Sequence, residues 1–174
     1  VTRQLKVGSA IYHILGRTPA TLALQAAGLD ELTGGRFLLG IGSSNPTIAK
    51  WHGQTFDHPL GRVREYIDIV RAALRGEKLT FDGEYFTAQN FKMAFKPSGR
   101  TIPIYLAAFG SQMTRLAGRV TDGVLINMAN PTEIRRIADE VRAGAIEAGK
   151  DPAQMEIICK IRCSIAPNYD TARE

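Results

Sequence analysis

The sequence predicts an α/β fold built on a parallel sheet. Short, continuous apolar runs alternate with amphipathic segments, and residues typical of helix starts and stops separate the two. Continuous apolar runs are typical of strands that are buried on both faces of a parallel sheet. Strand–helix–strand units join such strands by right-handed crossovers. Both a doubly wound sheet and a (β/α)8 barrel satisfy this pattern.

The first 42 residues contain a strand, a helix and a second strand. Residues 5–14 are apolar and β-branched enough to predict a buried strand. Thr18 suits a helix N-cap and Pro19 the first helical position, so a helix is expected to begin there. Gly34 and Gly35 should end it, and residues 36–41 predict the next strand.

Residues 43–102 interrupt this alternation. Helical spacing of apolar residues covers 62–74, and residues 78–87 predict a hairpin that turns at Asp82 and Gly83. Residues 95–99 read as a loop. We expect this excursion to lie at the mouth of the barrel.

The alternation then resumes. Residues 102–108, 123–128 and 155–165 predict three strands. Ser111 is expected to cap one helix, and Asn130, followed by Pro131 and Glu133, to cap another that ends at Gly149. The chain therefore has about five strands joined by βαβ connections.

The number of strands bears on the choice between the two folds. No G-x-G-x-x-G motif opens a helix, which weakens the dinucleotide-binding doubly wound alternative. A closed (β/α)8 barrel typically needs about 250 residues, and this chain has 174. We therefore expect residues 1–174 to form a single, incomplete barrel domain.

Composition excludes several classes of function. The net charge is +5, but the basic residues are scattered, so nucleic-acid binding is not predicted. No apolar run approaches the roughly 18 residues of a membrane span, and a cytoplasmic protein is expected. Histidine and cysteine spacings match no metal motif, and Cys159 and Cys163 are expected to be buried thiols in the last strand.

Ligands of parallel α/β folds bind at the carboxyl ends of the strands. We therefore expect the turns after Ile14, Gly42, Ala108 and Met128 to meet at one rim. At the third turn, Gly110 and Ser111 precede a helix whose amides could hold a phosphate, although any loop and cap would look the same.

Three other features at the strand ends are ambiguous. Gly40 and Gly42 could let a flat ligand approach the backbone, or could simply relieve crowding. Asn130 could bind a ligand or only cap its helix. Arg162 could pair with an acidic group of a cofactor if it lines the barrel, or be solvated at an edge.

Several motifs together resemble the luciferase-like superfamily. The segment AIYHILGRTPATLALQAAGLDELTGGRFLLGIG (10–42) is similar to its strand–helix–strand signature. The segments SSNPTIAKWHGQTFDHPL (43–60), FKPSG, PIYLAAFG and LAGRVTDGVLIN resemble the coenzyme F420-dependent oxidoreductase branch. The second half is also similar to methylenetetrahydromethanopterin reductases.

The resemblance implies an incomplete (β/α)8 barrel that contains about strands 3 to 7. It also implies a non-prolyl cis peptide bond between Ala10 and Ile11 that backs a deazaflavin ring. By the same resemblance His13, Ser43 and Ser44 contact the pyrimidine side and ribityl chain, and Ala108, Phe109, Gly110 and Ser111 bind the phosphate. Asn45, Asn127 and Asn130 would face the substrate.

The resemblance further implies hydride transfer between F420 and a small organic substrate, with methylenetetrahydromethanopterin as one candidate, and a homodimer. Several relatives have an acidic residue where this chain has Asn45, so proton transfer is not assigned there. The catalytic acid–base residues stay unassigned. The alternatives are an FMN-dependent monooxygenase on the same fold, and a non-catalytic homologue that only binds flavin or dimerises.

Overall fold

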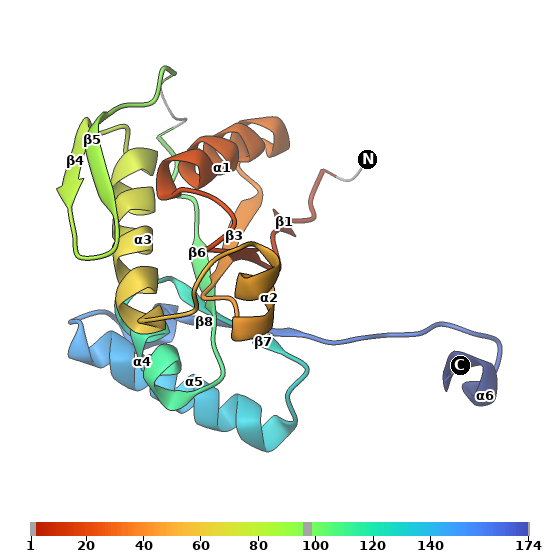
Figure 1. Cartoon of the computed structure of the whole chain (residues 1–174). Helices are drawn as coiled ribbons and strands as arrows, with labels where there is room; N and C mark the ends of the chain where they lie inside the picture. Colours follow the sequence, from red (N-terminus) through yellow and green to blue (C-terminus); the bar gives the residue numbers. More distant parts are fainter. Residues whose placement is uncertain (1–2, 96–98, 174) are drawn as a thin grey trace.

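The computed structural model describes residues 3–95 and 99–173 and has a six-stranded parallel sheet at its centre (Figure 1). Every strand pair in this sheet is parallel. The order is open among the described residues, so the fold is an incomplete (β/α)8 barrel, as predicted. The strands, in spatial order, are β1 (Val7–Gly8), β3 (Phe37–Gly42), β6 (Ile104–Ala107), β7 (Gly123–Asn127) and β8 (Glu156–Lys160), with β2 (Tyr12–His13) also paired to β3.

Four long helices cover one face of the sheet (Figure 1). They are α1 (Pro19–Thr33), α3 (Pro59–Leu74), α4 (Ser111–Val120) and α5 (Pro131–Glu147), and each packs beside the next. The core lies between this layer and the sheet. Its fully buried members include Leu22, Leu39, Tyr66, Ile104 and Ile137.

The predicted helix ends are confirmed at two helices. Thr18 accepts a hydrogen bond from the Thr21 amide at 3.2 Å, and α1 ends at Gly34, whose φ of 65° is left-handed. The side chain of Asn130 accepts a bond from the Glu133 amide at 2.9 Å at the start of α5. These bonds are local, which explains why sequence spacing could predict them.

The first predicted strand is broken and its first part, β1, is exposed, so the prediction of a buried strand over residues 5–14 was wrong in both extent and burial. Residues 9–11 leave the ladder between β1 and β2. The Ser9 hydroxyl donates to the Gly40 carbonyl at 3.0 Å and accepts from the Gly40 amide at 2.9 Å. A side chain thereby replaces the backbone pairing that a continuous strand would make with β3.

The last predicted strand is shorter than expected. It ends at Lys160, and residues 161–166 continue as an extended segment that leads away to α6 (Tyr169–Arg173; Figure 1). Cys159 is half-buried against the core, but Cys163 is exposed, so the expectation of two buried thiols was wrong for Cys163. Among the described residues β8 is the last strand of the sheet, and no described strand pairs with the segment that follows it.

The excursion divides into three parts. Helix α2 (Pro46–Trp51) was not predicted, and α3 is a crossover helix whose inner side belongs to the core. The antiparallel hairpin of β4 (Leu79–Asp82) and β5 (Thr87–Phe91) turns later than expected, over residues 83–86. The Glu65 carboxylate fixes that turn by accepting from the amides of residues 84, 85 and 86 at 2.8–3.0 Å. Outside the excursion, a short 3-10 helix, η1 (Pro152–Gln154), precedes β8.

Candidate functional site

The carboxyl ends of the parallel strands meet at one edge of the sheet. In the register, His13 lies beside Gly42, Gly42 beside Ala107, and Asn127 beside Lys160. Since all of these pairings are parallel, the turns that follow the strands open on the same side. The prediction that these turns share one rim is therefore confirmed.

Small residues form the inner face of the sheet near this rim. Leu106 and Val124 point into the core beneath the helices, so the residues that alternate with them point to the opposite face. Gly42, Ala107 and Leu125 are such residues and are adjacent in the register. The Ile11 side chain covers Gly42 on this face, so Ala107 is the small residue that stays beside the rim.

Gly40 and Gly42 are required because residues 9–11 lie directly against them. A Cβ atom on Gly40 would come within 2.1 Å of the Ser9 carbonyl oxygen, and one on Gly42 within 2.2 Å of Ile11 Cδ1. Relief of crowding is therefore the correct interpretation of these glycines. The peptide bond between Ala10 and Ile11 is cis, which confirms the predicted position of that bond.

Two buried polar atoms at the rim have no hydrogen-bond partner within the described residues: His13 Nδ1 and Ser44 Oγ. Burial, and secondarily the nearby His52 and Arg17, lower the pKa of His13, so its imidazole is neutral near pH 7. The His13 and His52 rings are 4.8 Å apart. Ser43 Oγ donates to the Ser44 carbonyl at 3.3 Å. Buried polar groups are nearly always paired, so a bound polar ligand would explain both unpaired atoms.

The loop between β6 and α4 differs from its prediction. Gly110 is the N-cap of α4 and Ser111 is its first residue, so the expectation that Ser111 caps the helix was wrong. The Ser111 hydroxyl instead donates to Glu140 at 2.8 Å. Ala108 is buried and Phe109 is half-exposed. Because glycine has no side chain to cap the first turn, an anion here would be bound by backbone amides.

Two of the three asparagines expected near the substrate are helix caps. Asn45 Oδ1 accepts from the Ile48 amide at 3.0 Å, and Asn130 Oδ1 from the Glu133 amide. Asn127 is exposed at the end of β7. The structural role of Asn45 and Asn130 is thus settled, and a substrate role for any of the three stays a prediction.

The last strand brings Lys160, not Arg162, to the rim. Lys160 is in register with Asn127 and so lies on the inner face of the sheet, whereas Arg162 is beyond the strand and exposed. In the sequence, Lys160 and Arg162 alternate with Cys159, Ile161 and Cys163, which gives the strand one polar face but does not say whether that face lines the barrel. The error was to extend the strand past residue 160.

Sequence reasoning missed the side chains that come from α2 and the hairpin. His52 ends α2 beside His13. The rings of His58 and Tyr85 stack at 5.5 Å and line a cleft of about 590 Å³ that also contacts Gly110 and Ser111. Only the cap pattern Asn45–Pro46 could have predicted α2, and no local signal places Tyr85 beside His58.

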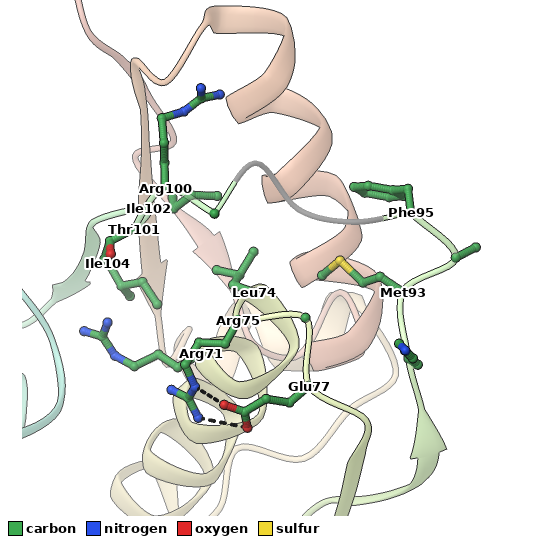
Figure 2. A pocket seen from close by; sticks show the side chains of 14 residues that line it. Arg71, Leu74, Arg75, Glu77, Met93, Phe95, Arg100, Thr101, Ile102 and Ile104 are labelled. Atoms are coloured by element: carbon green, nitrogen blue, oxygen red, sulfur yellow. Dashed lines mark hydrogen bonds and ion pairs between the residues drawn. The ribbon is translucent and has the colours of Figure 1, made fainter.

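A second cavity, of about 920 Å³, lies at the opposite end of the strands (Figure 2). Leu74, Met93 and Ile102 give it an apolar wall. Its arginines are engaged in ion pairs, which are Arg71–Asp122, Arg75–Glu77 and Arg100–Asp30. Active sites of barrel enzymes lie at the carboxyl ends of the strands, so the rim is the better candidate.

The described part of the chain has neither a metal-binding cluster nor a membrane helix. Among residues 3–95 and 99–173, no three His, Cys, Asp or Glu side chains are grouped so that they could hold a metal ion. No helix in the same ranges is long and apolar enough to span a bilayer. The rim fits a flavin-like group, since it combines helix amides at the start of α4 with two buried polar atoms, His13 Nδ1 and Ser44 Oγ, that have no partner among the described residues.

Comparison with known proteins gives matches along the whole chain. The profile of a family described as luciferase-like monooxygenase matches residues 1–174. The 5,10-methylenetetrahydromethanopterin reductase of Archaeoglobus fulgidus is 35% identical over 175 residues, which cover 99% of this chain and 51% of the relative. The reductase of the same name from Methanolobus tindarius is 36% identical over 90% of this chain and 47% of its own length.

Two solved structures have the same fold. The coenzyme F420-dependent tetrahydromethanopterin reductase of Methanopyrus kandleri superposes with a TM-score of 0.87 at 25% identity. An F420-dependent secondary alcohol dehydrogenase, in complex with an F420–acetone adduct, superposes with a TM-score of 0.89 at 26% identity. Each match covers 99% of this chain and 54% of the other. The chain thus spans about half the length of the relatives it matches.

Proposed function

The chain belongs to the luciferase-like monooxygenase family, and from this membership we propose that it carries the coenzyme site of an F420-dependent oxidoreductase. The reaction is hydride transfer between the deazaflavin and a small organic substrate, with methylenetetrahydromethanopterin-like compounds as the leading class. Relatives named as F420-dependent reductases or dehydrogenases support this proposal.

One observation carries the proposal: among the described residues, His13 Nδ1 and Ser44 Oγ are buried without hydrogen-bond partners at the ends of neighbouring strands. Leaving such a group unsatisfied costs about 1–3 kcal/mol. A ligand whose polar edge lies at the ends of β2 and β3 would satisfy both atoms. A neutral His13 also suits such contact, because it can accept as well as donate a hydrogen bond.

In this proposal, different residues of the rim bind the ring, the phosphate and the substrate. A bound deazaflavin supplies hydride chemistry, because carbon replaces N5 of a flavin. The chain contributes position: the segment at Ala10 and Ile11 backs the ring, and the amides at the start of α4 bind the phosphate. The remaining contacts are His13, Ser43 and Ser44 to the ring and ribityl chain, Ala108, Phe109, Gly110 and Ser111 around the phosphate, and Asn45, Asn127 and Asn130 to the substrate.

The side chain of Asn45 is not suited to proton transfer. An amide donates and accepts hydrogen bonds but takes up no proton near neutral pH. In this proposal Asn45 therefore orients the substrate, and the proton-transfer group lies elsewhere in the site. A homodimer and a cytoplasmic location, both expected from the sequence, stay part of the proposal.

Titration of the 174-residue chain with F420 and, separately, with FMN tests the proposal by coenzyme fluorescence. We expect saturable F420 binding that weakens about tenfold in a His13→Ala, Ser44→Ala double variant. Asp139→Ala, on the exposed side of α5, is the matched control and should bind as the parent does. Tighter FMN binding with oxygen consumption would favour the monooxygenase. Binding of neither coenzyme would favour a non-catalytic homologue.

A further inference from the structure

Arg136 connects α5 to the loop between β6 and α4. Its Nη2 atom donates to the Phe109 carbonyl oxygen at 2.9 Å, and its guanidinium carbon is 5.9 Å from the centre of the Phe109 ring. Glu133 and Glu140, on the same helix, accept hydrogen bonds from Arg136 at 2.9 and 3.0 Å. A guanidinium presents several donors in a fixed plane, so these contacts fix its orientation.

The Arg136 guanidinium also lies near Ser111, where the loop joins α4. Ser111 Oγ donates to Glu140 Oε1 at 2.8 Å and lies 3.4 Å from Arg136 Nη1. The frame behind this network is rigid, because α4 and α5 pack with their backbones in contact. A Cβ atom on Gly118 would come within 2.0 Å of the Val141 carbonyl oxygen.

The bond to Phe109 sets the direction of the next amide. In a planar trans peptide the carbonyl and the following N–H point in opposite directions. Since the Phe109 carbonyl points toward Arg136 on α5, the Gly110 N–H points away from α5. Gly110 also lines the cleft that lies between the starts of α3 and α4. A ligand in that cleft would therefore lie beside Gly110.

The charge of Arg136 is already balanced by two carboxylates, so this residue is poorly suited to bind an anion itself. We propose that Arg136 is a positioning residue: by holding the Phe109 carbonyl toward α5, it aims the Gly110 amide at the coenzyme phosphate. This inference rests on the proposed function, because it assumes that the loop binds that phosphate. It adds a residue from the following βα unit that acts only through the loop.

The test compares two ligands and two matched arginines. Binding of F420, and of a deazaflavin fragment that ends at the ribityl hydroxyl and has no phosphate, is measured for the parent chain, Arg136→Lys and Arg136→Met. Both variants should lose about tenfold in F420 affinity and less than about twofold for the fragment. Lysine keeps the charge but not the planar fork, so it should not rescue binding. Arg135→Met, at the exposed neighbouring position, should change neither affinity.

A second measurement reports the loop without any ligand. The amide resonance of Gly110 in ¹⁵N-labelled protein should shift in both Arg136 variants and not in Arg135→Met. The inference is overturned if the parent prefers F420 over the fragment and Arg136→Met keeps that preference, or if both affinities fall equally. If the parent itself does not distinguish the two ligands, the phosphate site of the proposed function fails too, and the inference fails with it.

Discussion

The two ends of the parallel strands differ in how their polar groups are hydrogen-bonded. At the amino-terminal end, Asp122 accepts from Arg71 Nη2 at 3.0 Å and from the Ile104 amide at 2.8 Å. Lys150 donates to the carbonyls of Gly118 and Thr121. At the carboxyl end, by contrast, His13 Nδ1 and Ser44 Oγ are buried and have no hydrogen-bond partner in the part of the chain that the structure describes.

This contrast separates residues that hold the fold together from residues kept ready for a ligand. Paired groups stabilise the folded chain by themselves, whereas unpaired buried groups cost stability until a ligand satisfies them. Barrel enzymes divide the two tasks between opposite ends of the strands in this way. Substitutions at the amino-terminal end should therefore change stability, and those at the carboxyl end should change binding.

The largest effect is expected within β3, between the two ends, where residues 9–11 pack against Gly40. Gly40→Ala should lower the free energy of unfolding by about 3 kcal/mol, because the new Cβ would meet backbone, the Ser9 carbonyl oxygen at 2.1 Å. Gly42→Ala is the matched control. Its Cβ would meet side-chain atoms and not backbone, chiefly the end of the Ile11 side chain, which can rotate, so the loss should be about 1 kcal/mol. Urea denaturation measures both, and equal losses would contradict a backbone clash at Gly40.

The next largest loss of stability is expected at the amino-terminal end of the strands. Asp122→Ala removes the acceptor of Arg71 and of the Ile104 amide and should cost about 2 kcal/mol. Coenzyme affinity of the folded protein should not change. Asp139→Ala removes an exposed carboxylate 3.7 Å from Arg142 and should cost less than about 0.5 kcal/mol. A loss of coenzyme affinity in Asp122→Ala would show that the two ends are coupled.

Local and distant interactions explain which features the sequence could predict. The caps at Thr18 and Asn130 depend on bonds to residues three positions away, so their spacing was visible. The break at Ser9 depends on Gly40, 31 residues later, and the Ser111 hydroxyl is taken by Glu140, 29 residues later. Neither partner leaves a local pattern.

The sequence likewise predicted some features of the candidate site and missed others. Parallel strands place their carboxyl ends together, so the rim followed from topology, and the cis bond at Ala10–Ile11 followed from family resemblance. The contacts of His13 with His52 could not be foreseen, because they depend on a short helix whose only signal was the cap at Asn45.

A smaller effect at the carboxyl end sharpens the contrast. Ser44→Ala removes a buried hydroxyl that has no partner within residues 3–95 and 99–173, so the free energy of unfolding should change by less than about 0.5 kcal/mol or rise slightly. Alanine and serine tolerate the φ of 77° at this position about equally badly. Affinity for F420 should fall about fivefold, measured by fluorescence titration. Lost stability with unchanged affinity would assign Ser44 to the fold instead.

The smallest effect is a pH dependence at His13. Burial, with lesser contributions from His52 and Arg17, places its pKa in the folded chain below the value of about 6.5 expected when unfolded. Between these two values the unfolded chain binds more protons, so stability rises with pH and is lost on acidification. The rise in stability is complete above about pH 6.5, and the fall on acidification levels off below the folded pKa.

Urea denaturation from pH 5 to pH 8 should show this dependence of stability on pH in the parent chain and a weaker one in His13→Gln. His52→Gln should weaken it only in part, because burial is the larger cause. If His13→Gln keeps the full slope, the imidazole is not held neutral by the fold, and the rim loses its best-placed acceptor for a ligand.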